Sequence, residues 1–171
     1  EKVVRAMAAN CERPLIFPLS NPPALAEARP ADVYQWSDGR ALVATGSPFP
    51  DVEIGGERFT IGQGNNAFIF PGVGLGAVAV SARAVSDEMF TAAAVRLAEL
   101  VPAERIARRC VFPAIGALQG VSRDIAVVVA RTAVAQGLAR DERAAADIEA
   151  AIDRRIWKPV YPRLVHRPAL P

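Results

Sequence analysis

Lysine, histidine and cysteine are scarce in this chain, and each scarcity removes a kind of chemistry. The lysines are Lys2 and Lys158, near the two ends, and the single histidine is His166, in a proline-rich tail. None is placed to act as a buried general base in the middle of the chain. Cys11 and Cys110 stand far apart without metal-type spacing. The sequence therefore predicts no disulfide framework and favours a reducing cytoplasm.

No charge of one sign prevails, and no hydrophobic run is long. The 20 Lys and Arg residues nearly balance 18 Asp and Glu, for a net charge of +2, which argues against a nucleic-acid partner. The longest apolar run, residues 67–80, is too short to cross a membrane and suits a buried helix. We therefore expect neither a nucleic-acid nor a membrane partner. Glu1 opens directly into a helical pattern without a signal peptide, so we expect a chain that begins inside a longer one.

Two fingerprints of cofactor and metal sites are also missing. Gly72, Gly74 and Gly76 follow a loop and lack the G-x-G-x-x-G spacing between a strand and a helix. Such glycines are tolerated where another element approaches a helix closely. No acidic cluster has metal-site spacing. The sequence therefore names no metal ligand and no catalytic acid or base in this chain.

What remains is a helix-rich chain with a few short apolar runs, which is typical of an α/β fold. Apolar residues at helical spacing predict helices, and two compact apolar runs predict strands with parallel pairing. Pro18 marks the first strand as an edge or a bulge, because it cannot donate to a ladder. Ser86 is the expected N-cap of one helix. We expect helices at residues 3–11, 71–80, 87–101, 122–138 and 141–156, strands at 15–19 and 40–45, and an extended arm from Trp157. Residues 24–36 are expected to contain helical material that is interrupted near Pro30.

A β-hairpin is the clearest local signal. Two apolar runs flank Gly55-Gly56, a two-residue turn of the kind that joins antiparallel strands. Pairing across this turn sets Glu53 opposite Arg58. It also puts four apolar residues on one face, namely Val52, Ile54, Phe59 and Ile61.

Two polar loops then stand out. Ser20-Asn21-Pro22, the first asparagine loop, follows the carboxyl end of the first strand, which is where ligands bind in open α/β sheets. The Asn21 amide offers one acceptor and two donors without charge, which suits a carboxylate, a hydroxyl or a carboxamide. The alternative is that Asn21 serves only as a turn residue before proline.

The second asparagine loop is Gly62-Gln63-Gly64-Asn65-Asn66. Its glycines permit backbone conformations that other residues avoid. Asn65 and Asn66 precede a buried helix, whose free N–H groups attract anions. One of them can cap that helix, but both cannot, so at least one amide is left for another role. The two loops therefore predict a polar small-molecule site that lacks reactive groups, as one wall of an active site would.

Three ordered blocks of this sequence resemble those of malic enzymes. The first runs from Arg13 through Ser20-Asn21-Pro22, and the second from Gly39 to Phe49. The third is the second asparagine loop followed by Phe70-Pro71-Gly72. The likeness continues beyond Ser86 and covers most of the chain. Two departures, Pro18 and Pro23, stand where relatives have a small non-proline residue and Thr, and they affect the backbone beside Asn21.

This resemblance implies oxidative decarboxylation of L-malate to pyruvate and CO2, with NAD or NADP as acceptor and Mg or Mn as Lewis acid. It implies that Asn21, Asn65 and Asn66 contact substrate, and that Ser20, Asn21 and Asn65 contact the cofactor. The catalytic acid, the base and the metal ligands of the family precede this region, so none is expected here. The full-length enzyme is expected to be a cytoplasmic homo-oligomer.

The resemblance also implies the organisation of the chain. Residues 1–171 would be the C-terminal part of a malic-enzyme NAD(P)-binding domain with a partial Rossmann-like parallel sheet. Within it we expect a Rossmann-like part with the hairpin insertion (1–85), C-terminal helices (86–156) and an extended tail (157–171). Alone, this piece is expected to be inactive. Two alternatives stay open: a piece of a malolactic enzyme, which releases lactate, and a non-catalytic binding or assembly module.

Overall fold

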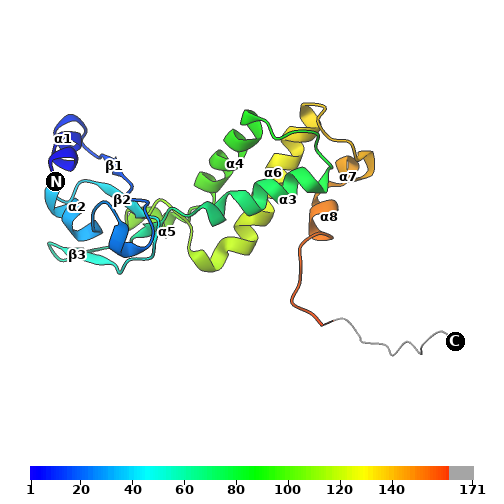
Figure 1. Ribbon diagram of the computed structural model, residues 1–171. Coiled ribbons are helices and arrows are strands. Elements are labelled where there is room, and N and C mark those ends of the chain that lie inside the picture. Colours follow the sequence, from blue (N-terminus) through cyan, green and yellow to red (C-terminus); the bar gives the residue numbers. More distant parts are fainter. Residues whose placement is uncertain (162–171) are drawn as a thin grey trace.

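The computed structural model describes residues 1–161, so the part of the expected tail beyond residue 161 lies outside the described residues. A sheet unit, from α1 to β5, occupies one end of the molecule, and a helical unit occupies the other (Figure 1). The elements are α1 (Lys2–Asn10), β1 (Leu15–Ile16), η1 (Pro23–Leu25), α2 (Pro30–Trp36), β2 (Leu42–Thr45), β3 (Val52–Ile54), β4 (Glu57–Phe59), β5 (Gly62–Gln63), η2 (Asn66–Phe68), α3 (Phe70–Ala79), α4 (Asp87–Glu99), α5 (Ala103–Ala107), η3 (Ile115–Ala117), α6 (Leu118–Ala135), α7 (Glu142–Ala146) and α8 (Ile148–Asp153). No helix within residues 1–161 has the length and apolar character needed to cross a membrane.

A three-stranded parallel sheet forms the centre of the sheet unit, in the order β1-β2-β5. Leu15 pairs with Leu42 on one side of β2, and Ala44 pairs with Gly62 on the other. The predicted α/β class and parallel pairing are therefore confirmed. A strand at Gly62–Gln63 was not predicted, because residues 62–66 were expected to be loop throughout. Its pairing depends on β2, which lies well before it in the sequence, so local propensity could not reveal it.

The first strand is shorter and more exposed than predicted. A buried strand over residues 15–19 was expected, but β1 contains two residues, and Leu15 and Leu19 are exposed. Pro18 explains the early end, because it has no N–H to donate to a ladder. The Pro18 carbonyl still accepts a hydrogen bond from the Gly46 N–H at 3.3 Å, which keeps the chain beside β2. β1 pairs with β2 alone among the described strands, as the edge position predicted from Pro18 requires.

The predicted hairpin is confirmed in its register. Glu53 lies opposite Arg58, and Val52 lies opposite Phe59. Gly55 and Gly56 both have positive φ, at 61° and 83°, which is the backbone that this tight turn requires. The apolar face of the hairpin packs on the core of the sheet unit, which contains Val33, Tyr34, Ala41, Val43, Phe59 and Ile61.

The helical unit is built on close contact between α3 and α6. A Cβ added at Gly72 would lie 2.6 Å from Ile125 Cγ2, and one at Gly76 would lie 2.5 Å from the Ala126 carbonyl oxygen. Glycine is therefore required at both positions for the two backbones to approach. Gly74 faces open space instead. The expected close approach to this helix is thus confirmed at two of its three alternating glycines.

Three predicted helices differ from the observed ones. The helix expected to have Pro71 in its first turn is observed as α3, which begins at Phe70, but it is not wholly buried, since Phe70 and Val78 are exposed. Residues 141–156 were expected to form one helix. They form α7 and α8 instead, because Asp147 accepts a hydrogen bond from the Ala150 N–H and caps a new helix. α6 begins at Leu118, ahead of the predicted Ser122, and α5 was not predicted.

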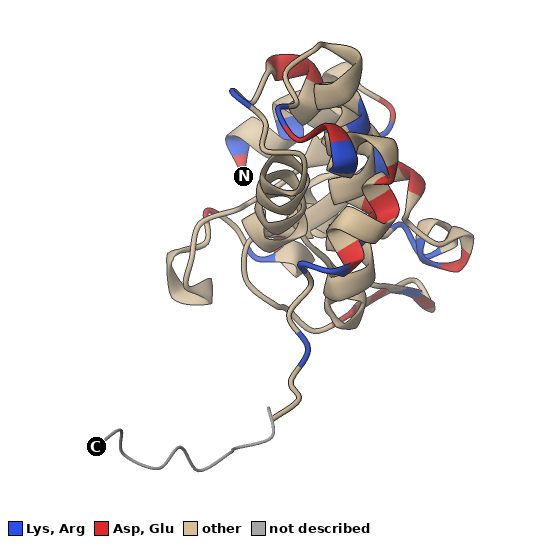
Figure 2. Ribbon diagram, turned by 90° about the vertical axis from the view of Figure 1, so that its right-hand side faces the viewer, with Lys and Arg blue, Asp and Glu red and all other residues tan. Residues whose placement is uncertain are grey.

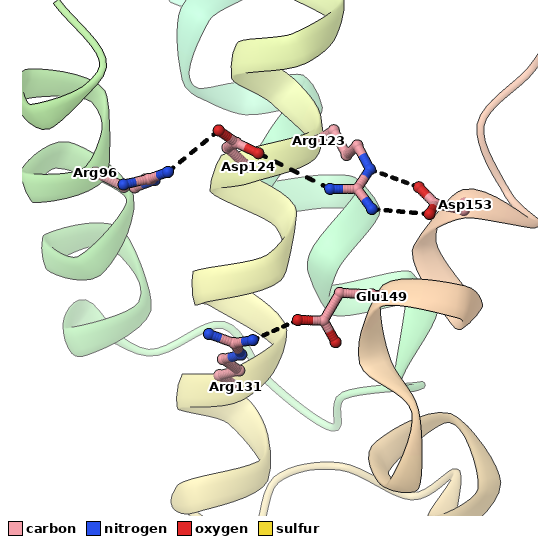
Figure 3. Close-up of polar contacts among 6 residues, drawn as sticks. All are labelled: Arg96, Arg123, Asp124, Arg131, Glu149 and Asp153. Atoms are coloured by element: carbon pink, nitrogen blue, oxygen red, sulfur yellow. Dashed lines mark hydrogen bonds and ion pairs between the residues drawn. The ribbon is translucent and has the colours of Figure 1, made fainter.

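Ion pairs join the outer surfaces of α4, α6 and α8 (Figure 3). Arg123 on α6 makes a two-pronged contact with Asp153 of α8, with nitrogen–oxygen distances of 2.6 and 2.8 Å. Asp124 reaches Arg96 on α4 at 3.2 Å, and Arg131 contacts Glu149. Each exposed pair is worth at most about 1 kcal/mol. Basic and acidic positions are interspersed along the ribbon in Figure 2. Because each exposed pair contributes little, the helical unit is held together mainly by its apolar core.

The α3 glycines give a matched pair of substitutions. Gly76→Ala forces a methyl group against the α6 backbone and should lower the free energy of unfolding by about 1–3 kcal/mol. Gly74→Ala adds a methyl group in open space within a helix and should raise it by about 0.5–1 kcal/mol. Urea titrations of the two variants beside the unchanged chain measure both effects. Equal effects of the two substitutions would contradict the close packing of α3 on α6.

Tyr34 predicts a dependence of stability on alkaline pH. Its hydroxyl is buried without a partner among the described residues, and burial raises the pKa of Tyr34 to about 12. The folded state therefore favours the neutral phenol, and this contribution is complete below the ordinary pKa of 10.0 and is lost as pH rises towards 12. Tyr34→Phe should raise the free energy of unfolding by about 1 kcal/mol at neutral pH and reduce the alkaline loss. Urea titrations at about pH 8 and about pH 11 compare the two proteins; an unchanged alkaline loss would count against this role.

Candidate functional site

The ends of the three parallel strands meet around Gly46, the residue that follows β2. The Gly46 carbonyl accepts a hydrogen bond from the Gln63 side chain of β5 at 3.1 Å, and its N–H donates to Pro18 after β1. A Cβ at Gly46 would lie 2.0 Å from the Leu19 carbonyl oxygen and 3.0 Å from Asn21 Nδ2. No other residue fits there without moving the first asparagine loop. Gly46 therefore allows that loop to lie against the end of β2.

Asn21 is oriented by a buried hydroxyl group. The Ser47 hydroxyl donates to Asn21 Oδ1, and Ser47 is itself held by the hydrogen bond from Thr45 Oγ1 to its carbonyl at 2.8 Å. Ser47 is 5% exposed, whereas Asn21 is exposed. The hydrogen bonds of the described chain use only the Oδ1 of this amide, so its Nδ2 hydrogens are left for a ligand. The Asn21–Pro22 peptide is cis.

The Asn65 amide also uses its oxygen within the protein and leaves its nitrogen without a partner among the described residues. Its Oδ1 accepts the Ala67 N–H at 2.9 Å and thereby caps η2. The expectation that one asparagine caps the following helix needs a correction, since the capped element is this short turn and α3 begins only afterwards. The Nδ2 of Asn65 has no acceptor among the described residues. Asn66 is exposed at the first position of η2, and the described hydrogen bonds do not use its side chain.

Ser20 faces a carboxylate that was not predicted. Its hydroxyl donates to Glu27 at 2.5 Å, and its N–H reaches the same carboxylate at 3.3 Å. The hydrogen bond from the Ser20 side chain lowers the pKa of Glu27, which is therefore ionised at neutral pH. The hydroxyl proton is thus committed to Glu27, and the Ser20 oxygen can act only as an acceptor towards any further partner.

The structure brings most of the predicted residues to one edge of the sheet. Asn21, which directly follows Ser20, contacts Ser47, and Leu19 Cδ2 would lie 3.1 Å from a Cβ at Gly64 in the second asparagine loop. The two loops are therefore in contact at their bases. No hydrogen bond among residues 1–161 links Asn66 to the first loop. Sequence reasoning missed the contacts of Ser47 with Asn21 and of Gln63 with Gly46, because these partners are distant in the sequence. It also missed Glu27, although its partner Ser20 is only seven residues away.

The two amides offer hydrogen-bond donors without charge, and the charge beside them is the Glu27 carboxylate that Ser20 contacts. Asn21 and Asn65 each direct an acceptor into the protein and keep two donors, so they suit the oxygen atoms of a carboxylate or a carboxamide. No group of three or more His, Cys, Asp and Glu residues within residues 1–161 is arranged to hold a metal ion. The site can therefore bind and orient a polar ligand through its amides.

Comparison with known proteins places this surface in an enzyme family. The sequence profile described as "Malic enzyme, NAD binding domain" matches residues 1–134. The NAD-dependent malic enzymes of Shewanella denitrificans and Aeromonas salmonicida are each 48% identical to the chain over 166 residues, which is 95% of this chain and 29% of each relative. The chain thus spans about 29% of the length of these relatives.

Solved structures agree in fold. The malic enzyme from Pyrococcus horikoshii has a TM-score of 0.57 and 28% sequence identity to this chain. The match covers 82% of this chain and 28% of the Pyrococcus enzyme. The Entamoeba histolytica malic enzyme has a TM-score of 0.54 and 29% identity, with coverage of 81% of this chain and 27% of its own. The predicted resemblance and the Rossmann-like class are therefore confirmed.

Substitutions at Asn65 separate its structural role from ligand binding. Asn65→Asp keeps the acceptor for the Ala67 N–H and should change the free energy of unfolding by less than about 0.5 kcal/mol. Asn65→Ala removes that acceptor and should cost about 1 kcal/mol. Asn66→Ala is the neighbouring control and should have little effect, because its side chain is exposed. Urea titration measures all three, and equal stability of the two Asn65 variants would argue against the cap.

Proposed function

This chain belongs to the family of malic enzyme NAD-binding domains, and we propose that it forms part of an enzyme that oxidatively decarboxylates L-malate to pyruvate and CO2 with NAD. The observation that carries the proposal is the pair of oriented amides, Asn21 and Asn65, which follow β1 and β5, the two parallel strands on either side of β2. Ligands of open α/β sheets bind at this edge. Both amides present donors, and the substrate and the nicotinamide carboxamide carry the matching acceptor oxygens.

In this proposal Asn21, Asn65 and Asn66 contact malate, while Ser20, Asn21 and Asn65 contact the nicotinamide end of the cofactor. When bound, NAD accepts the hydride from C2 of malate. The amide N–H groups hold the carboxylates of malate through charge-assisted hydrogen bonds. Because amides are neutral, they orient a dicarboxylate without adding positive charge beside the cationic nicotinamide ring.

The remaining chemistry is assigned to residues outside this chain. Malate decarboxylation in this family is expected to need Mg or Mn, but the donors at this site are amides, which are poor substitutes for the carboxylates that these metals prefer. The described residues therefore do not fit the metal, and no step through it is derived from them. The chain alone is accordingly expected to be inactive. NADP as acceptor, a homo-oligomeric full-length protein and a cytoplasmic location stay predictions.

A malolactic outcome is the alternative for the same site, and it differs in product. A malolactic enzyme would release lactate without net reduction of NAD, whereas the proposed enzyme releases pyruvate and NADH in equal amounts. The residues of this chain bind malate in both cases. Product analysis of the intact protein with L-malate, NAD and Mn therefore separates the two reactions.

Asn66→Ala in the intact protein tests the site directly. Loss of a hydrogen bond to a malate carboxylate should lower malate kcat/KM by the equivalent of about 1–3 kcal/mol, which is roughly 5- to 150-fold. NADH absorbance with varied malate measures it. Ser81→Ala is a control, because Ser81 lies after α3 in the helical unit, away from both asparagine loops. Two results would overturn the proposal: unchanged kinetics of Asn66→Ala, or no malate-dependent NAD reduction by the intact protein.

A further inference from the structure

Phe112 lies between the two asparagine loops and contacts the chain on either side. Its ring meets the Phe17 ring edge-on, with centroids 6.0 Å apart. It also lies 6.2 Å from the Phe68 ring. Phe17 shortly precedes the first asparagine loop, and Phe68 ends the η2 turn that the second loop enters. One aromatic ring therefore connects the segments that carry Asn21 and Asn66.

The same ring accounts for the spacing of the glycines in the second loop. A Cβ at Gly62 would lie 3.4 Å from Phe112 Cβ, and one at Gly64 would lie 3.2 Å from Phe112 Cζ. The side chain of Phe112 thus runs along this loop from its first glycine to its second. Phe112 occupies the room that side chains at Gly62 and Gly64 would need, so it packs directly on the backbone just before Asn65, and protein interiors yield little to added volume.

Phe112 is itself held in place by Arg105 and Cys110. Arg105 Nε donates to the Phe112 carbonyl at 2.8 Å, and its Nη2 lies 3.0 Å from Cys110 Sγ. The Cys110 N–H donates back to the Arg105 carbonyl at 2.9 Å. The Cys110 thiol is fully buried and would lie 3.0 Å from a Cβ at Gly62. Hydrogen bonds therefore hold the backbone of residues 110–112, after α5, and the Cys110 side chain packs against β5.

We propose that Phe112 is a positioning residue for the malate site, setting the placement of the Asn21 loop relative to the Asn65–Asn66 loop. This inference rests on the proposed function. Phe112 touches neither substrate nor cofactor in this role. It acts through the loops, where a displacement of about 1 Å can cost on the order of a hundredfold in rate. A rigid ring suits this task because it has few rotamers and packs in a defined orientation.

Phe112→Leu in the intact protein is the central test. It keeps an apolar side chain but removes the ring that joins the loops, so malate kcat/KM should fall at least about tenfold. If the substitution only destabilised the fold, fewer molecules would be active, so the apparent kcat would fall while the KM for malate stayed the same. If it misplaces the amides, as proposed, the KM for malate should also rise several-fold. Phe90→Leu is the matched control, since Phe90 pairs with Phe70 on the helical unit at 6.3 Å and lies outside the loops.

A second substitution tests the contact between the ring and the loop. Gly64→Ala alone should lower malate kcat/KM, because its methyl group meets Phe112 Cζ as well as Leu19 Cδ2. Phe112→Leu makes room for that methyl group. The double variant should therefore exceed the kcat/KM expected from multiplying the two single losses by at least about fivefold. A strictly multiplicative loss would overturn the proposed contact.

Hydrogen exchange gives a readout that does not require activity. The Gly46 and Gly64 amides donate to Pro18 and Thr45, and the Phe68 amide donates to Asn65. In Phe112→Leu, peptides covering both loops should exchange faster, while α4 should be unchanged. Faster exchange in neither loop, or in only one, would overturn the positioning role. Absence of malate activity in the unsubstituted protein would instead overturn the proposed function, and the exchange result would still decide the role of Phe112.

Discussion

The two hydrogen-bonded edges of β2 bring the asparagine loops together. β1 pairs with one edge and β5 with the other, and both run parallel to β2, so all three carboxyl ends point the same way. Each strand is very short, and the pairing needs support beyond its own ladder. Gly46 provides part of that support, because its missing side chain lets the segment after β1 lie against the end of β2. If either pairing shifted by one residue, an amide would leave the site.

The helical unit helps to hold the second asparagine loop in place. α3 rests on α6 through Gly72 and Gly76, which fixes the direction in which the chain leaves the second asparagine loop. The segment from α5 to Phe112 then returns to the sheet unit, where Arg109 lies over the Phe59 ring at 4.8 Å. The second loop is therefore held at both of its ends. The placement of the second asparagine loop thus depends on packing between the sheet unit and the helical unit as well as on strand pairing.

The local features could be predicted from sequence, and the features that depend on distant partners could not. The Gly55-Gly56 turn and the Ser86 cap are each specified by a few neighbouring residues, and both are observed. β5 could not be predicted because two residues, one of them glycine, carry no strand signal without β2 beside them. The division of the predicted helix at Asp147 was missed because an aspartate within a charged helical pattern is usually an exposed surface residue and not a new N-cap. For the site, residue types at strand ends indicated Asn21, Asn65 and Asn66. Ser47 and Phe112 act through contacts that only the fold creates.

Asparagine is well suited to both loops because its amide has two unlike ends. At Asn21 and Asn65 the oxygen serves the fold, accepting from Ser47 or from the Ala67 N–H. The nitrogen remains for the ligand. Aspartate would keep the internal contact but present only acceptors to a dicarboxylate, and lysine would reverse both properties. The fold therefore orients each amide before the ligand arrives, so little side-chain entropy is lost on binding. In the proposed function, this dual use lets a chain with few reactive side chains orient a charged ligand through neutral amides.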